Sequence, residues 1–475
     1  MESSLIVKPA AGCKNIGQLP VELIQHALTF LDMHSLRDSA LSCPLFFKVI
    51  KGAETVIVGK ILSRLIHHTV LPEAILAIQA LVLFKRSATP EIDTAQLLCQ
   101  RVPAPIRCSM FDGILLEGSH AIVTDFAGRF AQAALENEPR LRSAGLQLTS
   151  TELHRFQRAF YRFDLYCRTA NGVPPADPEE LQNRFFKHYS ACELEQIACV
   201  RDFLIREIAK PFNYLVDHDV TWGCFGVRYI SQHSSDIGNA IVSRGLPFVW
   251  GLCAYSGYEK WHAMLSYLED GRYYPGSTRS IEELFQLGGN RHIPDQSTPF
   301  ARLDKRQRKI LAGSSYYKDP DTGPARMWAW VYSRKPAGQL VANPCMRGYR
   351  RWAFPLWDFE RLKKAHLYGD PSLRGVARPG EFELEKYSTL DSVVNLAATQ
   401  KERWIIWRNG GTGWYAPDDL TKIEWSKDRL YFNKVAEPAS PDLAKRFIID
   451  YDRVCHGKWT FQKWLKRVLT NRGTS

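Results

Sequence analysis

The sequence lacks the features that define several classes of protein. No apolar run approaches the roughly 18 residues that a membrane span needs, and the first residues show no basic region followed by an apolar stretch, so we expect neither a membrane span nor a secretory signal. No repeat with a period of about 20–50 residues occurs, which argues against solenoids and propellers. With 45% hydrophobic and 24% charged residues, the chain of 475 residues has the composition of an ordinary globular protein.

The cysteines do not form a recognisable framework. There are eleven of them, an odd number, and no Cys-x-x-Cys occurs; the closest pair in the sequence is Cys192 and Cys199. This scatter argues against a zinc ribbon and against a set of disulfides. We therefore expect reduced, mostly buried thiols, as in proteins of the cytosol or nucleus.

Motifs for catalysis and cofactor binding are also lacking. The glycine-rich stretch 410–413 has no lysine of a phosphate-binding loop, and neither His-Glu-x-x-His nor Gly-x-Ser-x-Gly occurs. His67 and His68 are adjacent, so on a helix they would point about 100° apart and be poor joint metal ligands. The polar stretch 217–219 is interpreted as an exposed loop. We expect a protein without catalytic activity, cofactor or metal.

The net charge of +12 is unevenly distributed. Eight basic and two acidic side chains lie in the last 31 residues, which include a basic helix expected over 459–469, and a second basic cluster occupies 302–309. We interpret both as solvated helix faces. Nucleic-acid binding through the C-terminal helix remains a lesser alternative.

Helical signals predominate in the remainder of the chain. Capping boxes at 149–152, 190–193 and 280–283 each precede a run of apolar residues with helical spacing, and the second run is expected to stop near Pro211. Strand signals are limited to a possible short hairpin near 403–415. The predicted fold is mainly α, with a large irregular helical body, minor β structure and most tryptophans in the core.

The most informative stretch lies near the N-terminus. Leu19-Pro20 opens a run in which Leu23, Ile24, Leu28 and Leu31 form a broad apolar face, with proline expected at the first helical position. Ser35 can cap a second short helix that carries Leu36, and a third follows Cys43-Pro44, with Leu45, Phe46, Val49 and Ile50 expected to point inward. This segment has no net charge, and its apolar surface exceeds what three short helices can bury among themselves. That surface must contact the rest of the chain or a partner.

This segment resembles the F-box. The resemblance is carried by Leu19-Pro20, the turn 22–24, Leu28 and Leu31 at the end of the first helix, and by Asp32, Leu36 and Phe46-Phe47 further along. The usual aromatic-basic pair is only approximated by 46–48, and a terminal Leu-Trp is missing. Two later stretches, 158–167 and 349–362, are similar to segments that recur in F-box proteins of filamentous fungi.

The resemblance implies a division into a flexible tail (1–17), an F-box (18–62) and a mainly helical body (63–475), with possible boundaries near 171–178 and 312–324. An F-box binds a Skp-type adaptor, and through it a cullin scaffold, while the body recruits an unknown protein target for ubiquitination in the cytoplasm and/or nucleus. The residues expected to contact the adaptor are Leu19, Pro20, Leu23, Ile24, Leu28, Leu31 and Leu36. Alternatives are an F-box–adaptor complex, or a helical scaffold, that acts outside the ligase.

Overall fold

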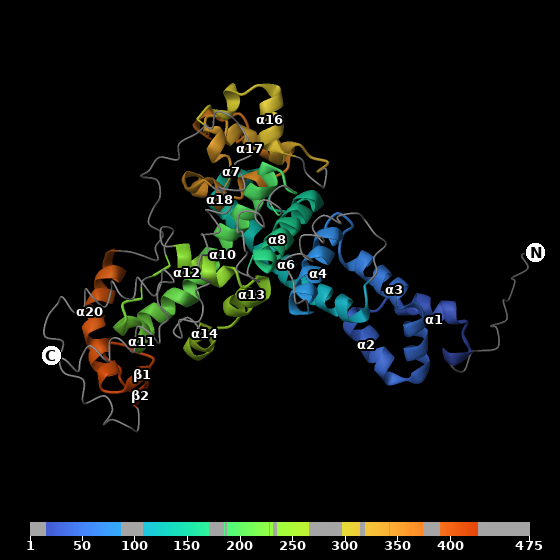
Figure 1. Cartoon of the computed structure of the whole chain (residues 1–475), viewed down its shortest axis with the longest axis horizontal. Helices are drawn as coiled ribbons and strands as arrows, with labels where there is room; N and C mark the ends of the chain where they lie inside the picture. Colours follow the sequence, from blue (N-terminus) through green and yellow to red (C-terminus); the bar gives the residue numbers. More distant parts are fainter. Residues whose placement is uncertain are drawn as a thin grey trace, which may run out of the picture.

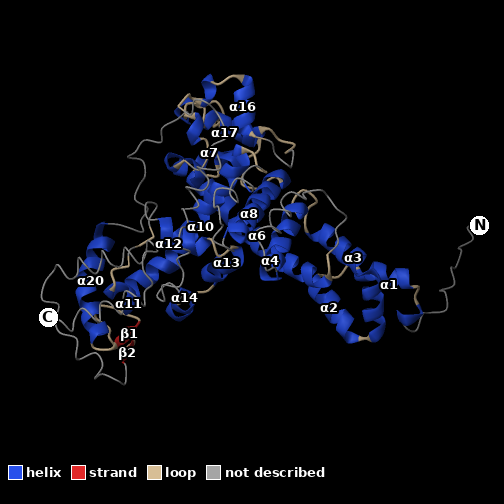
Figure 2. Cartoon of the chain, in the orientation of Figure 1, coloured by secondary structure: helices blue, strands red, loops and turns tan. Residues whose placement is uncertain are grey.

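The structure, a computed structural model, describes residues 16–86, 108–170, 185, 188–227, 229–230, 235–265, 297–313, 319–341, 343–373 and 390–425. These residues are mainly helical, as the sequence predicts (Figure 2). No helix within these ranges is long and apolar enough to cross a membrane. The predicted tail apart from its last two residues, the capping box at 280–283 and the basic helix at 459–469 lie outside the described residues, as does the possible boundary at 171–178.

The helices have the following bounds in chain order. The first half contains η1 (Ile16–Gln18), α1 (Val21–Leu28), α2 (Met33–Ser42), α3 (Pro44–Leu65), α4 (Leu71–Arg86), α6 (Met110–Asn137), α7 (Pro139–Ala144), α8 (Ser150–Ala170), α10 (Ala191–His218) and α11 (Val220–Cys224). The second half contains α12 (Ser235–Val242), α13 (Leu246–Ala254), α14 (Tyr258–Leu265), η3 (Phe300–Arg302), α16 (Lys305–Ala312), α17 (Gly323–Val331), η4 (Ala337–Gln339), η5 (Pro344–Met346), α18 (Arg347–Arg351), η6 (Phe354–Leu356), α19 (Phe359–Lys364), η7 (Pro371–Leu373) and α20 (Leu390–Arg408).

These helices form an arm and a body. Helices α1 to α3 project from the rest of the chain as the blue arm of Figure 1, and α4, α6 and α8 join this arm to the long helix α10. Helices α16 to α18 lie at one end of α10, and α11, α20 and the two strands lie at the other end (Figure 1). The helix α3 continues three residues past the boundary predicted at 62, to Leu65.

Aromatic rings fill the contact between α6, α8 and α10. The Phe130 ring stacks on Phe203 with 4.6 Å between their centroids, and Phe126 and Phe160 pack beside them. All four side chains are almost completely buried. Offset and edge-on aromatic contacts of this kind stabilise a core beyond simple area burial, so this cluster holds the long helices together.

The structure corrects two predictions about the elements. The helix α10 does not stop near Pro211 but runs through it to His218, because the proline is buried and packing offsets its missing N–H. Residues 403–407 are the last turns of α20 and not a strand. A short hairpin is present, but it pairs β1 (Gly411–Gly413) with β2 (Ile423–Trp425) in antiparallel register.

The polar stretch 217–219 is not a loop, and of its three residues only Asp217 is exposed. It ends α10, and Asp219 is only 1% exposed. One Asp219 carboxylate oxygen accepts the backbone N–H of Trp222 and thereby caps α11, while the other accepts the Tyr258 hydroxyl at 2.5 Å. Its role in these contacts is structural, and sequence spacing could not reveal the burial.

The adjacent histidines also differ from expectation. They lie in the turn that follows α3, and their rings are close, with 4.1 Å between the centroids of His67 and His68. The His67 ring stacks in turn on His154 of α8. Among the tryptophans expected in the core, Trp328, Trp352 and Trp357 are buried, whereas Trp330, Trp404, Trp407 and Trp414 are half-buried.

Acidification is expected to destabilise the contact between α6 and α8 through His120. Burial lowers the pKa of His120 to about 4, and its Nδ1 lies 3.2 Å from the Tyr161 hydroxyl. The unfolded chain would take up a proton near pH 6.5, whereas the folded chain would not do so until about pH 4. Between pH 7 and pH 5 this histidine should therefore lower the free energy of unfolding by about 2 kcal/mol.

Urea denaturation at the two pH values tests this expectation. In the His120→Gln variant, the difference in unfolding free energy between pH 7 and pH 5 should be about 2 kcal/mol smaller than in the wild type. The matched variant His34→Gln changes an exposed histidine of α2 and should keep the wild-type difference. An unchanged pH dependence in His120→Gln would contradict the assignment.

Candidate protein-binding surface

The first helix of the arm begins directly after Pro20. The proline occupies the capping position of α1, one residue before the first helical position where the sequence predicted it, with an extended backbone conformation. Proline suits this place because its fixed φ leads into the helix and its missing N–H would have no intrahelical partner. The helix ends at Thr29, whose hydroxyl donates to the His26 carbonyl oxygen at 2.7 Å.

The second helix is capped by Asp32, not by Ser35. An Asp32 carboxylate oxygen accepts the backbone N–H of Ser35 at 2.7 Å, and the other accepts the Ser35 hydroxyl at 2.9 Å. These two hydrogen bonds lower the pKa of Asp32. Both residues are typical capping residues, so only the local geometry decides which one takes the position.

The inner side of the arm is a continuous apolar core. Met33 of α2 reaches Gly113 of α6, where a Cβ would come within 2.5 Å of the Met33 methyl group, so glycine allows the two helices to approach closely. The helix α3 supplies the other side of this core through Ile57, Val58, Ile61 and Leu62, all of them at most 1% exposed. This core joins the arm to α6 and so to the rest of the chain.

An arginine at the end of α3 fixes the loop between α1 and α2. Arg64 donates to the carbonyl oxygens of Thr29 and Leu31 at 3.0 and 2.7 Å, and its guanidinium lies over the Phe30 ring. The loop carbonyls are thereby satisfied by a side chain distant in sequence. Phe30 itself remains 64% exposed.

The seven residues predicted to contact an adaptor differ in their exposure in the structure. Pro20 and Leu23 are exposed, and Leu19 and Leu31 are half-buried. Ile24, Leu28 and Leu36 are buried, at 3%, 5% and 0% exposure, inside the core of the chain itself. In the chain itself these three side chains are covered, because α1 packs against α3, and α2 packs against α3 and α6. Their contact with an adaptor stays a prediction.

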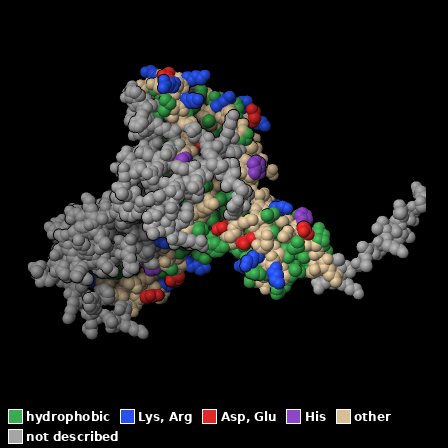
Figure 3. All heavy atoms as spheres, turned by 45° about the vertical axis from the view of Figure 1, so that its right-hand side comes forward, with side chains coloured by type: hydrophobic (Ala, Val, Ile, Leu, Met, Phe, Trp, Pro, Cys, Tyr) green, Lys and Arg blue, Asp and Glu red, His purple; other side chains and the backbone are tan. Residues whose placement is uncertain are grey.

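Other apolar side chains of the arm are exposed instead. Of the seventeen large hydrophobic side chains exposed in the described residues, nine lie between 16 and 65: Ile16, Val21, Leu23, Phe30, Leu41, Leu45, Phe47, Val56 and Leu65. Leu45 was expected to point inward and is 36% exposed. Hydrophobic side chains accordingly appear over the arm in Figure 3. Such a concentration on one small unit is typical of a protein-binding surface.

The sequence reasoning missed most of these residues because it placed the apolar face of α1 around its most regular stripe. The chain buries two residues of that stripe, Ile24 and Leu28, and leaves Leu23 exposed. The exposed side chains could have been predicted from the apolar residues that lie outside this regular stripe, namely Val21, Phe30, Leu41 and Phe47. Val21, Phe30 and Leu41 lie on or beside the short helices α1 and α2, and Phe47 lies in the first turn of α3.

The helix that contains the first of the two later stretches packs against the second stretch in the body. The first forms part of α8, and the second spans α18, η6 and α19. The Phe156 ring of α8 packs edge-on against Trp357, with 5.5 Å between centroids, and Arg155 donates to the Leu356 carbonyl oxygen at 2.7 Å. These contacts join segments that are about two hundred positions apart in the sequence.

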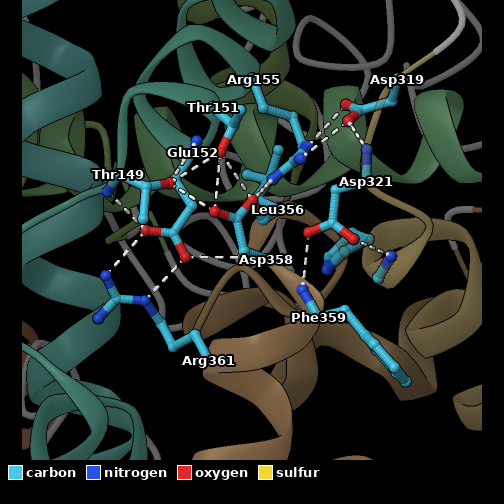
Figure 4. Close-up of polar contacts among 12 residues, drawn as sticks. Thr149, Thr151, Glu152, Arg155, Asp319, Asp321, Leu356, Asp358, Phe359 and Arg361 are labelled. Atoms are coloured by element: carbon cyan, nitrogen blue, oxygen red, sulfur yellow. Dashed lines mark hydrogen bonds and ion pairs between the residues drawn. The ribbon is translucent and has the colours of Figure 1, made fainter.

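A network of charges completes this contact (Figure 4). Glu152, which closes the predicted capping box with Thr149, also accepts two hydrogen bonds from the Arg361 guanidinium at 2.7 and 2.8 Å. Arg155 is bidentate to Asp319 and also reaches Asp358. Burial opposes ionisation of Asp358, but hydrogen bonds from Thr149 and Thr151 and the Arg155 charge hold its pKa below the usual value. The network is fully paired, which indicates a structural role and not an open site.

Comparisons with models of known protein families, with curated proteins and with solved structures find no match for this chain.

Proposed function

We propose that this chain is an F-box protein, the non-catalytic subunit of a Skp–cullin–F-box ubiquitin ligase that recruits the substrate. The arm, residues 16–65, would bind the Skp-type adaptor, and the body would bind an unknown target in the cytoplasm and/or nucleus. The observation that carries the proposal is the set of exposed apolar side chains on the arm, together with the F-box-like order of residues along it.

The composition of the surface supports a contact driven by apolar burial. The exposed set contains aliphatic and aromatic anchors, and the arm carries almost as many acidic as basic side chains. Protein interfaces of ordinary size depend on a few such anchors. The contact residues are proposed to be the exposed ones, Pro20, Val21, Leu23, Leu41 and Phe47, with Leu19 and Leu31 at the edge. Ile24, Leu28 and Leu36 would support the surface from inside.

The arrangement of the arm supports two simultaneous contacts. Helices α1 to α3 project away from α10 and from the helices at its ends (Figure 1). An adaptor on the arm would therefore leave most of the body accessible to a target. A ligase subunit of this kind acts by raising the effective concentration of the target beside activated ubiquitin.

Replacing Leu23 by Asp should weaken adaptor binding by at least about 30-fold, because a carboxylate would be buried in an apolar contact. Leu23 is 53% exposed, so the variant should fold as the wild type does. The measurement is the affinity of the purified chain for a Skp-type adaptor, together with capture of adaptor and cullin from cells. The control is Leu146→Asp, the same change at a leucine of the body that is 66% exposed.

Each outcome of this experiment distinguishes between the candidate functions. Equal adaptor binding by the wild type and Leu23→Asp, or no binding by either, would reject the proposed contact. Adaptor without cullin in the captured fraction would favour a complex or scaffold that works outside the ligase. Retention on DNA that falls steeply with salt and needs Lys463, Lys466 and Arg467 would favour the nucleic-acid alternative.

A further inference from the structure

A short basic helix at the upper end of the body presents the densest group of unpaired charges in the described residues. The helix α16 and the turn before it carry five exposed cations and one acid: Arg302, Lys305, Arg306, Arg308, Lys309 and Asp304. None of the five cations forms an ion pair within the described part of the chain. Exposed arginines elsewhere, such as Arg37 and Arg140, do find carboxylates.

The single acid in this group is already used by the helix itself. Asp304 caps α16 by accepting the backbone N–H of Gln307 at 2.8 Å. In turn, the side-chain oxygen of Gln307 accepts the backbone N–H of Asp304. Gly313 ends the helix with a positive φ, and Leu311 anchors it in the core. The cations therefore sit on a helix whose ends and orientation are fixed.

The cations of α16 lie close enough along the helix to repel each other. Within α16, Lys305 lies three residues before Arg308 and four before Lys309, which places like charges on adjacent turns of one face. Such pairs destabilise a helix unless an anion lies over them. A ligand with several negative charges would remove this repulsion, and a fixed helix would lose little freedom on binding it.

The outward face also carries an apolar side chain. Ile310 is 46% exposed and lies four residues after Arg306, so its side chain stands one turn further along the helix beside that of Arg306. A bare phosphate backbone would gain nothing from this isoleucine. A peptide segment that combines Asp or Glu with a nearby aliphatic residue would satisfy both the charges and the apolar contact.

We propose that α16 and Arg302 form a binding surface for an acidic protein segment that carries an aliphatic side chain. The helix, about 12 Å long, would contact only a short segment, which also favours a peptide over a nucleic acid. Figure 1 places α16 at the end of the body remote from α1, and Lys and Arg side chains gather there in Figure 3. Both partners could thus be bound at once. That the segment belongs to a ubiquitination target rests on the proposed function; the binding itself does not.

Fluorescence anisotropy of the full chain with labelled synthetic peptides tests the proposal. The acidic probe alternates Glu with Leu, and its matched probe replaces each Glu by Gln. The wild type should bind the acidic probe, with an affinity that falls as salt rises, and should not bind the Gln probe. The double variant Lys305→Glu/Lys309→Glu should weaken binding of the acidic probe at least tenfold.

Two control variants distinguish binding at this surface from an effect of net charge and from binding at the arm. The variant Lys210→Glu/Lys401→Glu makes the same change of charge at exposed lysines of α10 and α20 and should bind as the wild type does. The variant Leu23→Asp should also bind the acidic probe normally, so failure of this surface and failure of the adaptor contact are distinguishable. Ile310→Ser should weaken binding of the Glu-Leu probe but not of a Glu-Ser probe.

Three results would overturn the proposal. One is absence of binding by the wild type, and another is an equal loss in the Lys210/Lys401 control, which would indicate a response to net charge alone. The third is tighter binding of a single-stranded oligonucleotide of equal charge that depends on Lys305 and Lys309, which would assign the surface to nucleic acid.

Discussion

The variant Arg350→Met is expected to lose about 3–5 kcal/mol of unfolding free energy, because it removes a cation that lies between two buried carboxylates, although Asp202 keeps its ion pair with Arg201. Arg350 of α18 is 1% exposed, and its Nε lies 3.3 Å from both Glu195 and Asp202 of α10. Glu195 is fully buried and Asp202 nearly so. Burial alone would raise the pKa of Asp202, but Arg350 and Arg201 hold it below its usual value.

Denaturant unfolding at pH 7 measures the loss. The control is Arg37→Met, which removes an arginine whose ion pair with Asp38 is exposed on both sides, and it should change stability by less than about 1 kcal/mol. Because the pKa of Asp202 should rise when the Arg350 charge is removed, the stability deficit of Arg350→Met should shrink as the pH is lowered toward 5. Equal effects of the two variants would contradict the description of this ion cluster.

The variant Trp357→Ala is expected to cost about 3–5 kcal/mol, because it opens a large cavity in the core of the body. Trp357 is fully buried, its ring packs against Phe156 of α8 and beneath the Arg361 guanidinium, and its Nε1 donates to the Trp352 carbonyl oxygen at 2.7 Å. The loss of the ring removes apolar contacts and leaves that buried carbonyl without its donor.

The same denaturation measurement separates the two contributions. Trp357→Phe keeps most of the ring volume but not the donor, so it should cost about 1–3 kcal/mol, less than the alanine variant. Phe111→Ala truncates an aromatic residue of α6 that is 57% exposed and should change stability by about 0.5 kcal/mol or less. A stability of Trp357→Ala close to that of the wild type would show that the body does not depend on this contact.

Much of the local structure followed from the sequence. The capping boxes at Thr149–Glu152 and Ser190–Glu193 are both formed, since a side-chain oxygen and a carboxylate three residues apart satisfy the first amides of a helix without help from the rest of the chain. The mainly helical class was predicted correctly for the same reason: helical periodicity and capping are local. The run 403–407 was mistaken for a strand because a short stretch of Trp and Ile fits either element when no periodicity distinguishes them.

The division of the arm into inner and outer residues could not be predicted to the same extent. Sequence reasoning correctly found that the first helices carry more apolar surface than they can bury among themselves, but it assigned Ile24, Leu28 and Leu36 to the outside. Ile24 and Leu28 are buried where α1 packs against α3, and Leu36 is buried where α2 packs against α3 and α6. The helix α6 begins some seventy residues after Leu36 and approaches Met33 of α2 at Gly113. A contact of such long range leaves no signal in the spacing of the first helix.

The sequence by itself determined that the chain is mainly helical and where several helices begin, because each of these depends on neighbours within a few positions. Only the tertiary structure decided which leucines are covered, that Asp219 is buried, that Arg350 lies between two carboxylates of α10, and that the cations of α16 form no ion pair within the described residues. These depend on which distant segments pack together, and that is set by the three-dimensional fit of helix faces rather than by any local pattern.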